Sequence, residues 1–222
     1  MTFATFLPMV FRRFCAVFAA AAVLLLGAGA AHADDVEFRW AILADSTEGM
    51  RPLDFSGSPI VFSGTALQLY LEHLNNCHIY LFLLGAGNKL TPIYPPEKGY
   101  YDYGFPRGPK LVPPADQSFT FVPPAGMETI LLIATVERQF RIEELTEIFF
   151  NNPGSTEQQE LLLERIEELI VEGGEMKSKK AEKQRNVTIK YMAAGGIKER
   201  TFSAVEVDKK TFYGRKLLID HR

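Results

Sequence analysis

Cysteine is scarce in this sequence, and its scarcity limits the chemistry available to the chain. The 222 residues contain two cysteines, Cys15 and Cys77, and Cys15 lies in an N-terminal segment that we expect to be removed. One remaining thiol allows neither an intramolecular disulfide nor a thiolate metal cluster. A single thiol in an exported protein is usually buried, because an exposed one would be oxidised. We therefore expect Cys77 to be buried and unreactive.

Acidic residues are missing from the first 33 positions. Arg12 and Arg13 precede an apolar run over residues 14–26, which Ala31-His32-Ala33 follows. This order is typical of a secretory signal peptide, and the run is shorter than the ~20 residues of a membrane-spanning helix. We predict a signal peptide over residues 1–33, cleaved after Ala33, and a periplasmic or secreted mature chain. An uncleaved membrane anchor is the alternative, and the export route, general or twin-arginine, stays open.

An excess of positive charge is also absent. Removal of residues 1–33 takes away two arginines and no acid, so 24 − 2 = 22 basic residues face 27 acidic ones, a formal charge of −5 over the remaining 189 residues. Nucleic-acid-binding proteins usually show a net basic surface, so we expect no nucleic-acid partner. No second long apolar run follows, and we expect no transmembrane segment in the mature chain.

Motifs of catalysis and of cofactor binding are missing too. His73, His78 and His221 show no metal-ligand spacing, and the chain has no G-x-S-x-G, G-x-G-x-x-G or phosphate-binding G-x-x-x-x-G-K-[ST] pattern. We therefore predict no enzyme, no cofactor and no metal site. The alternative is an envelope hydrolase with an unrecognised site, for which His73, His78 and Asp102 are the candidates.

Short apolar segments of strand length dominate what is present. Residues 36–45 and 66–73 alternate apolar and polar side chains, and residues 128–136 form a continuous apolar run. A 3.6-residue period then appears in residues 138–173, where Ser155 or Thr156 can cap a helix over 156–172 with Leu162, Ile166 and Leu169 on its apolar face.

These segments predict one mainly β domain over residues 34–222. We expect an antiparallel β-sandwich or partly open barrel with a short helical insertion at 138–173 and C-terminal strands over 186–220, α+β by content. The basic run at 177–185 is typical of a solvated connector, or of a contact with an anionic partner.

Cys77 and His78 stand together at the head of the apolar segment HIYLFLL. Neighbouring side chains of a strand point to opposite faces. His78 is therefore poorly placed to act as a base for the Cys77 thiol, and we interpret the segment as a core strand followed by a hairpin.

Three segments carry a family likeness: FSGTALQLYLEH, CHIYLFLLGAGNKLTPIYP and FTFVPPAGMETILLIAT. Their order resembles the bacterial family called domain of unknown function 4384, over about residues 57–136. The chain departs from the family pattern at Thr65 and at Cys77 or His78. The resemblance implies a non-catalytic extracytoplasmic accessory domain. It implies no known activity and carries over no catalytic residue.

One cluster of aromatic residues is a candidate binding site: Tyr100, Tyr101, Tyr103 and Phe105. Exposed aromatic side chains are enriched where proteins bind partners, whereas large aromatic residues are on average well buried, so the cluster either binds a partner or plugs one end of the sandwich. We predict an exported accessory or binding protein of the bacterial cell envelope, with another envelope protein or a glycan as partner. A structural subunit of an envelope complex is a further alternative, and the oligomeric state stays open.

Overall fold

The first strand shows how the sequence builds two-faced sheets. In the computed structural model, which describes residues 35–105, 108–114, 116–193 and 195–222, strand β1 spans Asp35–Ala44. Its Val36, Phe38 and Trp40 are buried in the main core. Glu37 and Arg39 alternate with them and are half-buried, as expected for a sheet with one core face. The predicted signal peptide, residues 1–33, lies outside the described residues.

A seven-stranded sheet, called sheet A here, contains β1. Its strands run in the order β10-β11-β1-β4-β7, with β2 beside β1 and β8 beside β4, and all of these pairs are antiparallel. Besides β1 the sheet comprises β2 (Arg51–Pro52), β4 (Ala66–His73), β7 (Gly108–Val112), β8 (Phe119–Thr120), β10 (Glu182–Ala193) and β11 (Gly196–Lys210). Sheet A curls into half a barrel, and a small apolar cluster that includes Leu43, Tyr70 and Phe202 forms apart from the main core.

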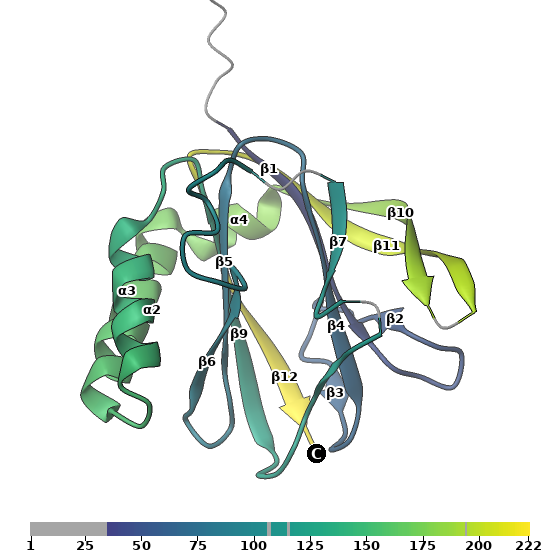
Figure 1. Ribbon diagram of the computed structural model, residues 1–222, viewed down its shortest axis with the longest axis horizontal. Coiled ribbons are helices and arrows are strands. Elements are labelled where there is room, and N and C mark those ends of the chain that lie inside the picture. The colour runs from purple at the N-terminus through teal and green to yellow at the C-terminus, as the bar shows by residue number, and fades with distance from the viewer. Residues whose placement is uncertain (1–34, 106–107, 115, 194) are drawn as a thin grey trace, which may run out of the picture. The chain divides into compact units, whose positions relative to one another are not determined.

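A five-stranded sheet, sheet B, faces sheet A (Figure 1). Its order is β3-β12-β9-β5-β6, and only the short β3–β12 pair among the described strands of this sheet is parallel. The strands are β3 (Ile60–Val61), β5 (His78–Leu84), β6 (Leu90–Tyr94), β9 (Gly126–Thr135) and β12 (Phe212–His221). Proline removes a ladder donor, and β6 with Pro92 lies at the edge, as its sequence predicts.

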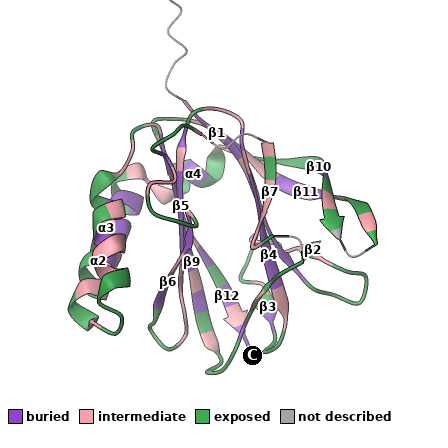
Figure 2. Ribbon diagram, viewed as in Figure 1, coloured by how far each residue is buried: buried purple, intermediate pink, exposed green. Residues whose placement is uncertain are grey.

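Two helices, α2 (Phe140–Asn151) and α3 (Thr156–Gly173), cover the side of sheet B that faces away from sheet A (Figure 1). The short helix α4 (Glu175–Lys180) follows α3 and packs on β12, and its Ser178 accepts a hydrogen bond from Lys209 of β11. Figure 2 shows buried residues along β1 and β5 and on α3, and exposed ones at the tip of the β10–β11 hairpin. The main core joins residues of both sheets with residues of α2 and α3. The prediction of a mainly β fold with a helical insertion is therefore confirmed.

Helix α3 forms as the sequence predicts at its first turn. The Ser155 hydroxyl accepts the Gln158 N–H at 3.3 Å, the usual role of an N-cap residue. Gln159 makes tertiary contacts, because its side chain accepts the Leu90 N–H at 2.9 Å and donates to the Asn88 carbonyl at 2.8 Å. The helix ends at Gly173, where a Cβ would lie 1.7 Å from the Phe212 ring, so close packing requires glycine there.

The run at 177–185 is solvated along its basic side chains, which are exposed, but it is regular structure and not a simple connector. Residues of this run form the end of α4 and the start of β10, and Ser178 is buried. The Ser178 hydroxyl accepts both the Gly214 N–H at 3.0 Å and the Lys209 ammonium at 2.9 Å. The sequence of this run does not reveal the structure, because the residues that contact Ser178 lie far along the chain.

No helix within the described ranges combines the length and the apolar character that a membrane crossing requires.

The buried face of α3 provides a test of the helix packing. Leu162 is fully buried, whereas its neighbour Leu161 is exposed. Leu162→Ala should lower the free energy of unfolding by about 2–5 kcal/mol, because truncation leaves a cavity. Leu161→Ala should change it by no more than about 0.5 kcal/mol. Urea unfolding of both variants measures the difference, and equal values would mean that α3 does not dock on sheet B.

Candidate functional site

Tyr101 attaches the aromatic segment, residues 100–105, to the core strand β5. Its hydroxyl accepts the Ile79 N–H at 2.8 Å and donates to the Ile79 carbonyl, also at 2.8 Å. Strand β6 ends at Tyr94, which pairs with Leu81, so Ile79 lies beyond the β5–β6 ladder. The hydroxyl replaces the missing strand partner, because buried backbone groups require hydrogen-bond partners.

The other members of the segment have different environments. Tyr101 is 7% exposed and Tyr103 is 100% exposed. Tyr100 and Phe105 are half-buried and pack against the main core. The four aromatic residues therefore do not share one exposed face: Tyr101 fills the core, Tyr103 points to solvent, and the other two lie between these extremes.

This difference predicts opposite effects of two similar substitutions. Tyr101→Ser should cost about 3–5 kcal/mol of unfolding free energy, the range for truncating a buried large aromatic side chain. Tyr103→Ser should stay within about 0.5 kcal/mol of the parent protein. Chemical denaturation measures the unfolding free energy of both variants. If Tyr101→Ser leaves it unchanged, the segment does not plug the sandwich.

A chain of side-chain contacts runs from Cys77 to the segment. The Cys77 sulfur lies 3.9 Å from His73 Nδ1, and His73 Nε2 lies 3.2 Å from the Tyr94 hydroxyl, which donates to the Tyr100 hydroxyl at 2.8 Å. Cys77 is fully buried, as predicted. Its nearest imidazole is that of His73, four residues earlier on β4, whereas its sequence neighbour His78 bonds elsewhere. Burial raises the pKa of Tyr94 far above its ordinary value, so this hydroxyl stays protonated at neutral pH.

His78 supports the segment from the other side. Its ring lies 4.9 Å from the Tyr101 ring and 4.8 Å from the Phe105 ring, centroid to centroid. Its Nδ1–H donates to the Val136 carbonyl at 2.9 Å. Desolvation by burial lowers the pKa of His78 below its ordinary value; the Val136 carbonyl and Glu143 oppose this effect, and Arg138 adds to it.

The lowered pKa of His78 predicts acid sensitivity. Below the ordinary histidine value of 6.5 the unfolded chain binds a proton at this position that the folded chain resists, so protonation favours unfolding. The contribution of neutral His78 to the unfolding free energy is fully present above pH 6.5 and is lost as the pH falls toward the folded-state pKa. Between about pH 7.5 and pH 5, His78→Gln should therefore lose less unfolding free energy than the parent protein. Equal losses in urea titrations would contradict this assignment.

A groove of about 430 Å³ opens beside the segment. Its floor comes from Tyr80 and Phe82 of β5 and Tyr94 of β6, one wall comes from residues 95–102, and the other comes from α2. On α2, Phe140 is 69% exposed and Phe150 is 62% exposed, and both line the groove. Aromatic side chains thus line the groove from three elements that are separate in the sequence.

Arg138 joins the two walls. Its guanidinium donates to Asp102 Oδ1 at 2.6 Å and to both Glu143 oxygens at 2.5–2.9 Å, and it lies 4.8 Å from the Phe140 ring centroid. The Tyr80 hydroxyl donates to Glu143 at 2.8 Å. These bonds, chiefly those to Glu143, raise the pKa of Arg138, so its guanidinium stays charged.

The rim of the groove is acidic. Two cations, Lys98 and Arg138, oppose five carboxylates, which gives 2 − 5 = −3; the acids are Glu97, Asp102, Glu143, Glu144 and Glu147. Lys98 pairs with Glu147. A groove with an aromatic floor and an acidic rim favours an apolar ligand that carries positive charge.

Each of the residues proposed for a hydrolase has a bonding partner outside that set. His73 contacts Cys77 and Tyr94, His78 bonds the Val136 carbonyl, and Asp102 bonds Arg138. Sequence reasoning missed Arg138, Glu143 and the exposed pair Phe140 and Phe150. The 3.6-residue period of residues 138–173 is visible in the sequence, but it does not show that Phe140 and Phe150 are exposed, and no local pattern links Arg138 to Asp102.

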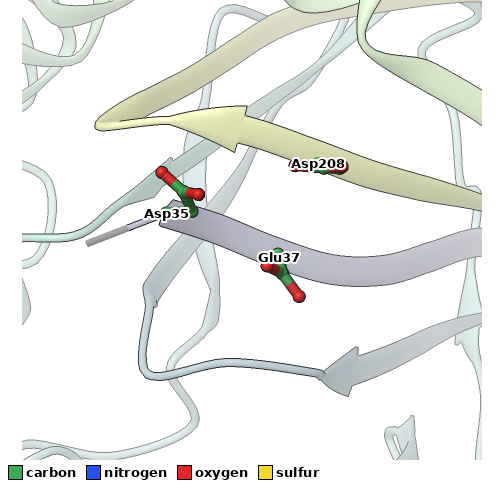
Figure 3. Close-up of side chains that lie close together, drawn as sticks. All are labelled: Asp35, Glu37 and Asp208. Atoms are coloured by element: carbon green, nitrogen blue, oxygen red, sulfur yellow. The ribbon is translucent and has the colours of Figure 1, made fainter. Parts of the chain in front are cut away.

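One acidic cluster is a possible cation-binding set. Single carboxylate oxygens of Asp35, Glu37 and Asp208 lie within 4.8 Å of one another (Figure 3). They come from the paired strands β1 and β11, where Glu37 lies opposite Asp208. Carboxylates are ligands that Ca²⁺ and Mg²⁺ accept, but exposed acidic groups commonly gather without an ion, and the cluster alone assigns no function.

Comparison with known proteins agrees with the sequence resemblance. Residues 61–138 match the family model described as domain of unknown function (DUF4384), as predicted. No curated protein and no solved structure matches the chain. The matched region contains β4–β9 and the whole aromatic segment, and it ends at Arg138.

Proposed function

We propose that this chain is an exported accessory protein of the bacterial cell envelope that binds another envelope protein through the groove. The observation that carries the proposal is the pair of exposed phenylalanines, Phe140 and Phe150, beside an aromatic floor in a groove of about 430 Å³. That volume lies within the roughly 300–1,000 Å³ common for binding sites. The signal peptide predicted for residues 1–33 supports the export part.

The groove favours an extended peptide segment as its occupant. Interfaces commonly depend on a few aromatic or aliphatic anchors that fill a pocket. The formal −3 charge of the lining favours an anchor flanked by Lys or Arg, because complementary charge speeds encounter and fixes orientation. Within the groove lining Arg138 is held by Asp102 and Glu143, so its guanidinium is already positioned before a partner binds.

The edge strand β6 offers backbone hydrogen-bonding groups beside the groove. In sheet B, β6 pairs with β5 and forms the end of the strand order. An incoming strand can add to such an edge, but Pro92 and Pro95 in and after β6 reduce the donors on offer. The side chains of the groove therefore supply most of the recognition.

Paired variants test the groove. Phe140→Ser with Phe150→Ser should abolish capture of the partner from the solubilised envelope, because the anchors carry most of the binding energy. Val171→Ser with Met176→Ser removes two apolar side chains of similar exposure outside the groove and should leave capture unchanged. Quantitative mass spectrometry compares the captured proteins.

Three outcomes count against the proposal. Identical capture by both paired variants would contradict the groove as binding site. Release of the captured material by glycosidase would contradict a protein partner. Recovery of the chain only from the cytoplasm would contradict the export part.

A further inference from the structure

A second polar constellation lies at the other end of sheet B. Strand β9 pairs with His78 at Thr135 and with His221 at Gly126, so the aromatic segment and the C-terminal residues mark opposite ends of this sheet. At the C-terminal end, Ser63 follows β3, Glu128 belongs to β9, and His221 ends β12. Three segments distant in sequence therefore meet there.

The three side chains form one hydrogen-bonded line. The Ser63 hydroxyl lies 2.9 Å from His221 Nε2, and His221 Nδ1 lies 3.0 Å from Glu128 Oε1. The second Glu128 oxygen accepts the Ala86 N–H at 3.1 Å. His221 is 1% exposed and Glu128 is 4% exposed, whereas Ser63 lies at the surface. The Phe121 ring stacks on the imidazole with 5.0 Å between centroids.

The connectivity favours the tautomer with the proton on His221 Nδ1. A carboxylate that accepts a backbone N–H is an acceptor for Nδ1–H as well. With the proton on Nδ1, the free Nε2 lone pair points to the Ser63 hydroxyl and can take its proton. Nucleophile, base and orienting acid are recognised by this geometry and these roles, and not by their order in a sequence.

We propose that Ser63 is an acyl-accepting nucleophile, with His221 as its general base and Glu128 as the residue that orients His221. The substrate class is an ester with a short apolar acyl group. Phe62 precedes Ser63 in the sequence and is 62% exposed, and Val122 follows Phe121 and is 66% exposed. This is apolar surface on which an acyl chain can lie.

The reaction balances without a further reactant except water. The Ser63 oxygen bonds to the acyl carbon while its proton moves to His221 Nε2. The ester C–O bond then breaks, and the leaving alcohol takes that proton. Water next attacks the acyl-serine, gives a proton to Nε2 and releases the acid, and the Ser63 oxygen recovers the proton.

The backbone around Ser63 limits the rate. The Ser63 N–H donates to the Arg222 carbonyl at 2.8 Å, and the Gly64 N–H donates to the Phe121 carbonyl at 2.9 Å. Neither is free to bind an oxyanion, and a missing oxyanion donor costs roughly 10²–10³ in rate. The site therefore favours activated esters, and these are the appropriate probes.

The test uses p-nitrophenyl acetate and a fluorophosphonate with the full-length protein. The parent protein should hydrolyse the ester at least about tenfold faster than Ser63→Ala, in line with the 10²–10⁴-fold typical of general-base assistance. It should also carry one phosphonate on the peptide that contains Ser63. Ser58→Ala, which removes another exposed hydroxyl, should behave as the parent protein.

Glu128→Gln tests whether Glu128 orients His221 or only fills a buried position. A folded Glu128→Gln protein should keep Ser63 in place but label more slowly, with a changed pH profile, because the amide no longer stabilises the imidazolium. If this variant fails to fold, the surface variant Ser63→Ala still decides. Equal ester hydrolysis by the parent protein and Ser63→Ala, or phosphonylation of Ser58 as fast as that of Ser63, would overturn the proposal.

Discussion

The two hydrogen bonds between the Tyr101 hydroxyl and the backbone of Ile79 hold the groove together. Where β6 ends, β5 presents an N–H and a carbonyl to the core without a strand partner, and leaving such groups unsatisfied costs about 1–3 kcal/mol each. One phenol satisfies both groups and carries the connecting segment with it. Tyr100 and Asp102, on either side of Tyr101, are thereby placed beside the groove.

Arg138 links the aromatic segment to helix α2. It bonds Asp102 of the segment and Glu143 of α2, so the two walls of the groove are fixed relative to each other. Tyr80 reinforces the arrangement from the sheet, because its hydroxyl both donates to Glu143 and accepts the Gln139 N–H at 3.0 Å. A charged pair with several hydrogen bonds in partial burial is stronger than an exposed one. The aromatic anchors of α2 therefore extend from a rigid frame.

The sequence predicts the strands because their signals are local. The alternation in residues 36–45 and the apolar run of 128–136 correspond to β1 and β9, and Ser155 caps α3 as its position suggests. The basic side chains of 177–185 are exposed, as a solvated run predicts, but the sequence does not predict α4 and the start of β10, where Ser178 is buried by contacts from Lys209 and Gly214. The aromatic segment is visible as composition, but nothing local distinguishes Tyr101, which enters the core, from Tyr103, which does not.

The same limit applies to both candidate sites. Arg138 lies 36 residues from Asp102, and His221 lies 158 residues from Ser63. These pairs depend on how the strands and helices are ordered in space, which periodicity does not specify. A family model that stops at residue 138 contains one wall of the groove and lacks the other.

Amide hydrogen exchange at Ile79 tests the central constraint most directly. Tyr101→Phe removes the hydroxyl and keeps the ring. Exchange of the Ile79 N–H should then speed up by about tenfold or more, the factor that corresponds to ~1.4 kcal/mol, while the Leu132 N–H in the middle of sheet B keeps its protection. Unchanged protection of Ile79 in the Tyr101→Phe protein would show that the segment is held by other contacts and would contradict the account.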